Sequence, residues 1–563
     1  MNVAISRKRP GLLYALAVAL PFTAQAEETV VVTATPPASA SAPTEGYSAS
    51  TSLGATKTDQ PLITTAQSVS VVTRQQMADQ GANTISQALE YTPGVYSSFG
   101  GGATRFDAIS LRGYHGGDVD NLFLDGMRLM SDGGSHNVLQ IDPWFIERVD
   151  VIRGPSSALY GQSVPGGVVN LTSKRPQFSQ QGHIRLTGGT QNTKGAAFDY
   201  TDAINDQWAW RLIGMTRSSD TQYDHTREER YAISPSLLWQ PDSDTSLLLR
   251  AYLQKDPSGG YHGSLPLDGT RYAHNGRKLS PSTNEGDPGD GYQRRQQIYS
   301  YEFDHQFTDV WSVYSAGSYT HTNVSLDQVY QVGWIDDSDM LARGYSGSRG
   351  SLDGWSTDNR LRADFNTGDL AHTLILGAEY HRFRNDLWTG AGGAAPLNPF
   401  SGYTAQTGHT VTYSDDNNRR YYQTGLYLQD EMVWNRWLND NVNGQPVVLE
   451  ASGDSYKDYD NRVSAMTGLS TVLGWYVHEW LWRNNLEEEN QRKEDVQTIY
   501  TSSNAEQIKS LIEKYKISYL FIGSCEVEKY GEINSEFLTS LGKVVFRQGE
   551  TMIIEVFDGE RGD

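Results

Sequence analysis

Polar and apolar residues alternate in strand-length segments through the middle of the chain. One face of an extended strand at 247–254 carries Leu247, Leu249, Ala251 and Leu253, and the other carries Arg250, Tyr252 and Gln254. Residues 373–383 repeat the pattern, with Glu379 on the polar face. Alternation predicts β-strands with one apolar side, but it does not show whether that side faces lipid or a soluble core.

The connections between these segments alternate between short and long. Short connections are predicted near 205–206, 241–244, 308–309 and 367–369. Long connections are predicted at 219–230, 255–296, 322–355 and 386–419. Short turns on one side and long loops on the other are typical of outer-membrane barrels. About ten strands are expected before Trp434, which predicts an antiparallel transmembrane β-barrel with its apolar face outward.

The region before the barrel, residues 51–176, has the pattern of a compact α+β domain. A strand is predicted at Val69–Thr73, followed by a helix from Arg74 to Tyr91. Ile109–Tyr114 and Leu122–Gly126 are predicted strand-and-turn units, the second with an Asp-Gly hairpin. The length of this region is typical of a single domain.

Glu147–Pro176 closes that domain with two β-prone runs, VDVI and GVVNLTS, joined by a Gly/Pro/Ser-rich crossing. Arg153 stands directly before Gly154 and Pro155, where the backbone turns sharply. A charged side chain fixed at such a turn is costly without a partner, so we expect one for Arg153.

The first residues indicate export. Basic residues at positions 7–9 precede a short apolar run and the small-residue pattern Ala24-Gln25-Ala26. The apolar run is shorter than the roughly 20 residues of a spanning helix, so residues 1–26 are a predicted signal peptide. Residues 27–50 follow as a β-prone run, Glu28–Ala34, and an Ala/Ser/Pro-rich linker. Such a peptide is suited to pairing with another protein's sheet edge, although it could equally be a frayed tail.

Composition narrows the class of protein. The 563-residue chain has a formal net charge of −21, which argues against a nucleic-acid partner. With Cys525 as its one cysteine, it can form no intrachain disulfide. Its 55 glycines and 32 tyrosines, without a long apolar helix, are typical of a membrane β-barrel, but a large secreted all-β enzyme would have a similar composition.

Seven motifs occur in a fixed order: the export signal, ETVVVTA, QSVSVVTRQQM, YTPGV, LRGY, FLDGMRL and IERVDVIRGPSSALYGQSVPGGVVNLTSKRP. This order resembles the signal and plug domain of TonB-dependent outer-membrane receptors of the ferric-siderophore branch, and the resemblance extends to about Trp434. It implies that Glu28, Thr29, Val30, Val31, Val32, Thr33 and Ala34 form a TonB box. It also implies that Arg112 and Arg153 hold the plug to glutamates of the barrel.

The resemblance further implies a receptor of the bacterial outer membrane that imports a ferric siderophore. Its partners would be TonB with its inner-membrane energising complex, outer-membrane lipid and a siderophore, which we expect to be of the hydroxamate type. Iron would arrive chelated, so neither a cofactor nor a protein metal ligand is expected. The predicted ligand contacts are Arg105, Tyr114, His115, Asp118, Ser131, Asp132, Tyr261, His262, Tyr292, Tyr319, His321, Tyr330 and Trp334.

After Trp434 the alternation stops, although a barrel that holds a plug has about 22 strands. Helical spacing begins at Leu486, and residues 435–563 are predicted to form a small α/β domain. The phrases GQPVVLEASGDSY, TGLSTVLGWYVHEWLWR, IYTS and EKYKISYLFIG resemble the extracytoplasmic domain of YYY-type polytopic membrane proteins, related to membrane glycosyltransferases. We expect domains at 51–176, 177–434 and 435–563, with an unnatural join near Asn435.

No motif in the receptor portion indicates an enzyme. Gly161–Gly167 lacks both the spacing of a dinucleotide loop and the lysine of a phosphate loop. His478-Glu479 lacks the second histidine of a zinc protease, and Asp118–Asp120 lacks calcium-loop spacing. A siderophore receptor, a glycan-processing fragment in a non-functional chimera, and a plain porin remain as functional hypotheses. The porin has the least support because porins need no N-terminal domain.

Overall fold

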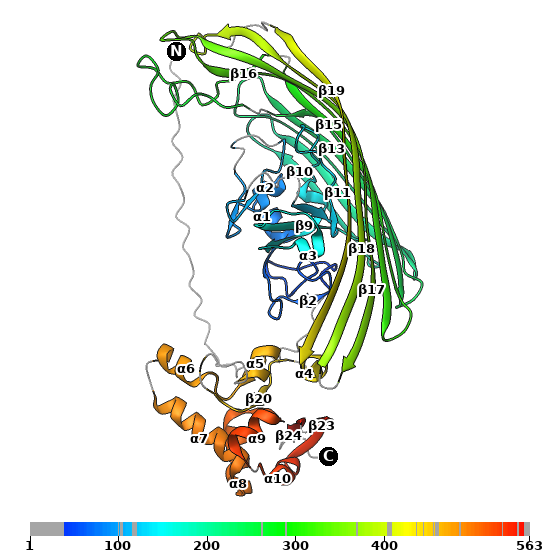
Figure 1. Ribbon diagram of the computed structural model, residues 1–563, viewed down its shortest axis with the longest axis vertical. Helices are drawn as coiled ribbons and strands as arrows, with labels where there is room; N and C mark the ends of the chain where they lie inside the picture. The colour runs from blue at the N-terminus through cyan, green and yellow to red at the C-terminus, as the bar shows by residue number, and fades with distance from the viewer. Residues whose placement is uncertain are drawn as a thin grey trace, which may run out of the picture.

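The computed structural model describes residues 39–98, 101, 105–114, 121–260, 263–287, 290–367, 370–401, 408–434, 436–442, 444–453, 455, 461–483, 486–531, 533–548 and 551–556. The predicted signal peptide and the predicted TonB box lie outside the described residues. The fold is mainly β. It comprises an α+β plug, a large curved sheet and a small α/β unit (Figure 1).

The plug is built on a five-stranded sheet in the order β3-β8-β9-β6-β7. The long central pair β8 and β9 is buried along its whole length because its branched residues have packed neighbours on both faces. The plug elements are β1 (Thr51–Ser52), β2 (Gln60–Pro61), β3 (Ser68–Thr73), α1 (Arg74–Asp79), α2 (Ile85–Ala88), β4 (Val95–Tyr96), β5 (Ser110–Leu111), β6 (Leu122–Leu124), β7 (Met127–Arg128), the 3-10 helix Pro143–Phe145, β8 (Ile146–Arg153), α3 (Ser157–Tyr160) and β9 (Gly167–Ser173).

The predicted strands of the plug are found, but the predicted helix from Arg74 to Tyr91 is wrong as a single element. It is divided into α1 and α2 around Gly81, whose φ of +65° ends the first helix. Thr84 then caps α2 by accepting a hydrogen bond from the Gln87 amide. The Asp-Gly hairpin is confirmed, with positive φ at both turn residues.

The curved sheet, which we call the wall, has ten antiparallel strands in sequence order. It bends around the plug, which lies on its concave side (Figure 1). Among the described residues the first and last strands pair on one side only. The strands are β10 (Gln181–Gly188), β11 (Lys194–Asn205), β12 (Trp208–Asp220), β13 (Arg227–Trp239), β14 (Thr245–Gly259), β15 (Gly291–Gln306), β16 (Trp311–Trp334), β17 (Leu341–Thr367), β18 (Leu370–Leu397) and β19 (His409–Trp434).

The polar face of the wall is turned toward the plug, which settles the orientation that alternation left open. Arg250 and Tyr252 are 8% and 4% exposed, whereas Leu249 and Leu376 on the opposite face are 45% and 54% exposed. Plug and wall also share one hydrophobic core, because Ile298 and other inward wall residues pack with plug residues such as Phe145. The outer face of the wall is therefore apolar, and its polar inner face packs against the plug.

Three of the four predicted long connections are wrong in extent. The β16–β17 connection covers only 335–340, because these strands are 24 and 27 residues long and continue the wall. The β12–β13 and β18–β19 connections are shortened in the same way, whereas the described residues between β14 and β15, which are 260, 263–287 and 290, form a long loop. Polar residues on both faces made these strand extensions resemble loops in the sequence.

The α/β unit lies beyond the ends of β17–β19 (Figure 1) and contains a five-stranded sheet in the order β21-β20-β22-β24-β23. Its own core includes Tyr500, Ile508 and Leu520. No helix in the described part of the chain is long and apolar enough to cross a membrane. The elements are α4 (Arg436–Asn441), β20 (Val447–Leu449), α5 (Arg462–Thr467), β21 (Ser470–Thr471), α6 (Tyr476–Arg483), α7 (Glu487–Thr501), α8 (Ala505–Tyr515), β22 (Ile517–Ile522), α9 (Ser524–Tyr530), α10 (Ser535–Thr539), β23 (Gly542–Gln548) and β24 (Thr551–Val556).

Candidate ligand site and plug–wall interface

An aromatic cluster covers the plug where it meets the upper parts of β15 and β16. Tyr292 is fully buried, packs edge-on against Phe106 at 5.5 Å and donates a hydrogen bond to the His136 carbonyl at 3.0 Å. The Arg105 guanidinium lies 5.4 Å from the Tyr292 ring, and the rings of His136 and Phe106 stack at 6.1 Å. Burial lowers the pKa of His136, and the charge of Arg105 adds to this effect. A neutral imidazole, a guanidinium and aromatic rings can bind a bulky, moderately polar ligand.

A second group ties the plug to the far strands of the wall. The Asp132 carboxylate accepts a hydrogen bond from the Asn385 amide at 2.8 Å and forms an ion pair with Arg419 at 3.4 Å. Ser131 is buried, and its hydroxyl accepts a hydrogen bond from the Leu139 amide. Asp132 and Ser131 thus hold the shape of this plug loop, and their hydrogen-bonding capacity is already used within the protein.

The structure brings only some of the predicted ligand residues together. Arg105 and Tyr292 meet, whereas Tyr319 and His321 lie on the outer face of the wall with Trp355 and Asp353. Tyr330 is 38% exposed on β16, and Tyr114 is half-exposed elsewhere on the plug. The remaining candidates lie outside the described residues: His115, Asp118, Tyr261 and His262.

Trp334 lies in a stack of outer connections rather than on the plug. Its ring stacks on His274 at 3.7 Å and on Phe400 at 5.8 Å, and its indole donates to the Asp268 carbonyl. Since His274 also hydrogen-bonds Ser338, residues from three separate connections are joined here. No sequence feature indicated this stack, or the positions of Phe106 and His136, because neither spacing nor alternation shows which loops converge.

Buried ion pairs surround the plug. On one side Lys174 pairs with Asp199 at 2.9 Å, and Asp142 pairs with Arg230 at 3.4 Å. Further round, Asp125 pairs with Arg250, and Arg175 with Glu302. Each pair joins a plug residue to an inward wall residue, and the wall partners come from β11 to β15. A displacement of the plug would therefore separate charges in a medium where they are poorly solvated.

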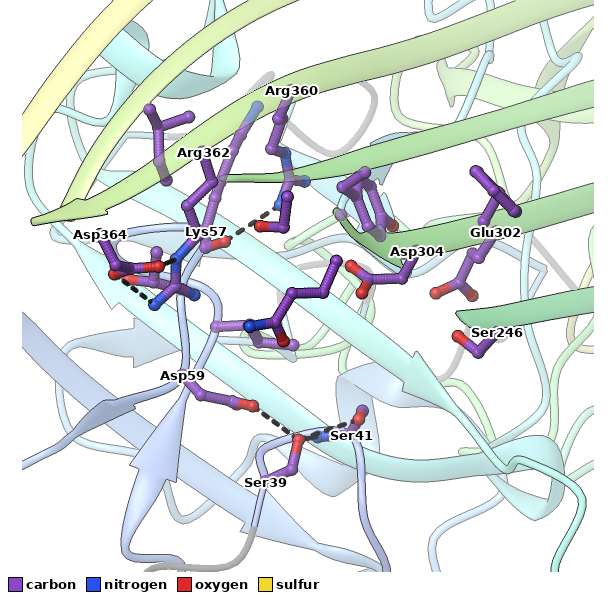
Figure 2. Close-up of a pocket in the computed structure, with 18 of the residues that line it drawn as sticks. Ser39, Ser41, Lys57, Asp59, Ser246, Glu302, Asp304, Arg360, Arg362 and Asp364 are labelled. Atoms are coloured by element: carbon purple, nitrogen blue, oxygen red, sulfur yellow. Dashed lines mark hydrogen bonds and ion pairs between the residues drawn. The ribbon is translucent and has the colours of Figure 1, made fainter. Parts of the chain in front are cut away.

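Lys57 provides the contact to β17 and β18. Its ammonium lies 3.1 Å from the Asp358 carboxylate and 3.7 Å from that of Glu379, and the side chains are at most 5% exposed. It also lies 4.3 Å from the Tyr427 ring, and Arg360 donates to its backbone carbonyl (Figure 2). Burial lowers the pKa of Lys57, although the Asp358 charge opposes that effect. The resemblance had not indicated this residue.

The two predicted latch arginines lie next to each other. Arg153 donates to the Pro93 carbonyl at 2.7 Å and to the Ser70 hydroxyl at 2.9 Å, and burial, with a smaller effect from the Arg112 charge, lowers its pKa. The described wall strands place no carboxylate within ion-pairing distance of either arginine. The partner of Arg153 in this structure is the plug itself, and the latch to barrel glutamates stays a prediction.

Comparison with known proteins identifies the family to which the plug belongs. Residues 61–168 match the TonB-dependent Receptor Plug Domain. The chain is 58% identical over 442 residues to the ferrioxamine receptor of Yersinia enterocolitica, covering 76% of this chain and 61% of that receptor. It is 46% identical over 391 residues to the ferrioxamine B receptor of Salmonella typhimurium (strain SL1344), covering 68% of this chain and 55% of that receptor.

A solved structure shows the same fold. The ferripyoverdine receptor of the outer membrane of Pseudomonas aeruginosa, bound to ferripyoverdine, superposes with a TM-score of 0.61 at 20% identity, covering 69% of this chain and 53% of that receptor. The plug and wall are thus a plug domain and part of a barrel of the TonB-dependent receptor type, located in the bacterial outer membrane. The chain spans about 55–61% of the length of the curated relatives described above, which are receptors rather than enzymes.

Proposed function

We propose that the chain represents a receptor that binds a ferric siderophore at the outer surface and imports it into the periplasm with energy supplied through TonB. The observation that carries the proposal is a plug of the matched family seated against the polar face of a membrane-type sheet. A porin would need no domain fixed to its wall by buried ion pairs. The plug closes the passage, so import requires that it move or change shape.

The energetics explain why an external energy source is needed. Separating a buried ion pair costs about 3–5 kcal/mol when one charge is left without its partner. The plug has such pairs at Lys57, Asp142 and Lys174 among others. Thermal motion alone would rarely break several at once. We propose that Glu28–Ala34 forms the TonB box, which TonB binds by strand addition and pulls.

We further propose a hydroxamate-type siderophore as the ligand. The ferrioxamine receptors among the relatives support this class, and so does the chemistry of the cluster around Tyr292. The rings of Phe106 and His136 offer apolar contact, and Arg105 offers a donor for hydroxamate oxygens. Arg105, Tyr292, Tyr330 and Trp334 at the end of β16 remain the proposed contacts. Tyr319 and His321 are proposed instead to lie at the lipid boundary, where tyrosine is common.

Uptake of ⁵⁵Fe-ferrioxamine by iron-limited cells tests this function. The cells should lack other ferrioxamine receptors and produce this chain. We expect energy-dependent uptake that is abolished by deletion of residues 28–34, while binding at the cell surface is retained. Replacement of Pro36 and Pro37 by alanine, just beyond the predicted box, serves as a control and should retain most uptake. Unchanged uptake after deletion of residues 28–34 would contradict the proposal.

The alternative inference is that residues 435–563 belong to a different protein, an extracytoplasmic domain of a membrane glycan-processing type, joined to the receptor near Asn435. Two observations support this inference: the wall gives way after β19 to a unit with a separate core, and three of that unit's strands run parallel. In that case the chain is a non-functional chimera and shows no uptake, so the uptake measurement above decides between this alternative and the proposed receptor. A sequencing read that crosses the junction within one genomic clone would refute the join.

A further inference from the structure

A cavity of about 650 Å³ separates the plug from the middle strands of the wall, at the end nearest the short turns. Its plug side includes Lys57, Tyr160 and Arg175, and its wall side comes from β14 to β18 (Figure 2). Other gaps along the same interface are far smaller, about 10 and 20 Å³. The size lies within the range of small-molecule sites, roughly 300–1,000 Å³.

Strand register produces the polar lining. Ser246, Asp304, Tyr314 and Arg360 are successive cross-strand partners on β14, β15, β16 and β17. Paired residues share a face, so all four side chains point toward the plug. A row of hydroxyl, carboxylate, phenol and guanidinium groups thus crosses the cavity wall. Because the row lies in the middle of the sheet, the cavity is bounded by paired strands on both sides.

Most charged groups around the cavity are already paired. Asp364 is bound by Arg362 at 2.7 Å, and Asp59 by the Ser39 hydroxyl at 2.6 Å. Asp304 is exposed, and, as for the neighbouring Asp309, no described side chain forms a hydrogen bond or ion pair with it. In Figure 2 its carboxylate points into the open space. The positive charges of Arg362 and Arg360 attract this carboxylate electrostatically, but from distances longer than that of an ion pair.

Buried atoms beside Asp304 also lack partners. Glu302 is 7% exposed on the same face of β15, and its Oε1 accepts no hydrogen bond. That oxygen lies 3.6 Å from the Arg250 guanidinium. On the plug side, the Nε of Arg175 donates to no acceptor. Buried polar groups are normally satisfied, so unmatched donors and acceptors around one space indicate a missing polar occupant.

We propose that this cavity is an exit-side binding site, in which the imported chelate rests between the plug and the periplasm, with the Asp304 carboxylate receiving a cationic group of the chelate. This proposal depends on the proposed function and adds to it the chemical class of chelate that the site prefers. Arg175 Nε and the Tyr314 phenol then face the hydroxamate and amide oxygens. Chelates with a free ammonium group are favoured at this step over neutral analogues.

The test compares two chelates that differ in one charge. Ferrioxamine B carries a free ammonium group, and its N-acetylated form does not. Uptake of both, loaded with ⁵⁵Fe, is measured in cells producing the chain or its Asp304→Asn variant. We expect the variant to import ferrioxamine B about tenfold more slowly, the effect of one charge-assisted hydrogen bond, and the acetylated chelate at the unsubstituted rate. Surface binding without TonB should be unchanged for both.

Two further variants control for structure and net charge. Asp304→Glu keeps the carboxylate and should restore the preference for ferrioxamine B. Asp206→Asn removes the same charge from an exposed turn outside the cavity and should leave both rates unchanged. If Asp304→Asn fails to assemble, as lost surface binding would show, Asp304→Ser removes the charge with a smaller side chain. Equal rates for the two chelates in all variants would overturn the exit-side site alone. Failure of the unsubstituted chain to import either chelate would overturn the proposed function as well.

Discussion

Lys57 and Asp358 form a buried ion pair whose two halves are not equivalent. Asp358 also accepts hydrogen bonds from Arg360 and from the Tyr427 hydroxyl, each at 2.7 Å, so it keeps partners when Lys57 is lost. Lys57→Met should lower the free energy of unfolding by about 1–3 kcal/mol. Asp358→Leu removes the carboxylate paired with Arg360 and leaves Lys57 with only Glu379 at 3.7 Å, and it should cost about 3–5 kcal/mol. Urea unfolding in detergent compares the two, and a reversed order would contradict this view.

Lys174 gives the interface a pH dependence. Burial lowers its pKa to about 8 from 10.5, although Asp199 opposes the shift. Between these values the unfolded chain binds more protons than the native state, so the free energy of unfolding rises with pH through this window. Below pH 8 Lys174 is protonated in both the native and the unfolded state, so the full free-energy cost of burying its charge opposes folding. The stability of the unsubstituted chain relative to Lys174→Met should therefore increase from pH 8 to pH 10.5. Parallel curves for the two proteins would show that Lys174 does not titrate there.

At the scale of elements, alternation was sufficient to predict the ten strands and the polar face, because residues such as Arg250 repeat with the period of a strand. It failed where both faces are polar. Tyr319 and Thr320 are neighbours with similar polarity, yet only Thr320 is buried toward the plug. Register decides which of the two is inward, and register depends on pairing with distant strands. The site residues Phe106 and His136 were missed because they lie in plug loops, and the sequence does not show which loops converge.

The outward face of β18 can be tested by charge. Leu376 is 54% exposed on the apolar side, where lipid is the expected neighbour. Leu376→Lys should reduce the stability of the folded sheet in lipid vesicles by up to about 2–4 kcal/mol, depending on depth. Val332→Lys is a matched control near the end of β16, already 66% exposed, and should change stability by less than about 0.5 kcal/mol. Folding titrations in vesicles measure both, and equal effects would place Leu376 in water.

At the scale of the whole molecule, separate cores imply separate unfolding. The plug and wall share a core that includes Ile298, whereas the α/β unit is built around residues such as Ile508, which is fully buried. The chain should therefore unfold in two transitions. Ile508→Ala should destabilise only one of them, by about 2–5 kcal/mol, and Ile298→Ala only the other.

Scanning calorimetry of the full chain and its two variants distinguishes these cases. The transition lowered by Ile508→Ala should coincide with the unfolding of residues 436–556 produced alone. A single transition moved by both substitutions would mean that the α/β unit and the receptor portion fold as one body. Residues 435–563 would then be an integral part of the receptor, because a unit from an unrelated protein has no reason to share its cooperativity.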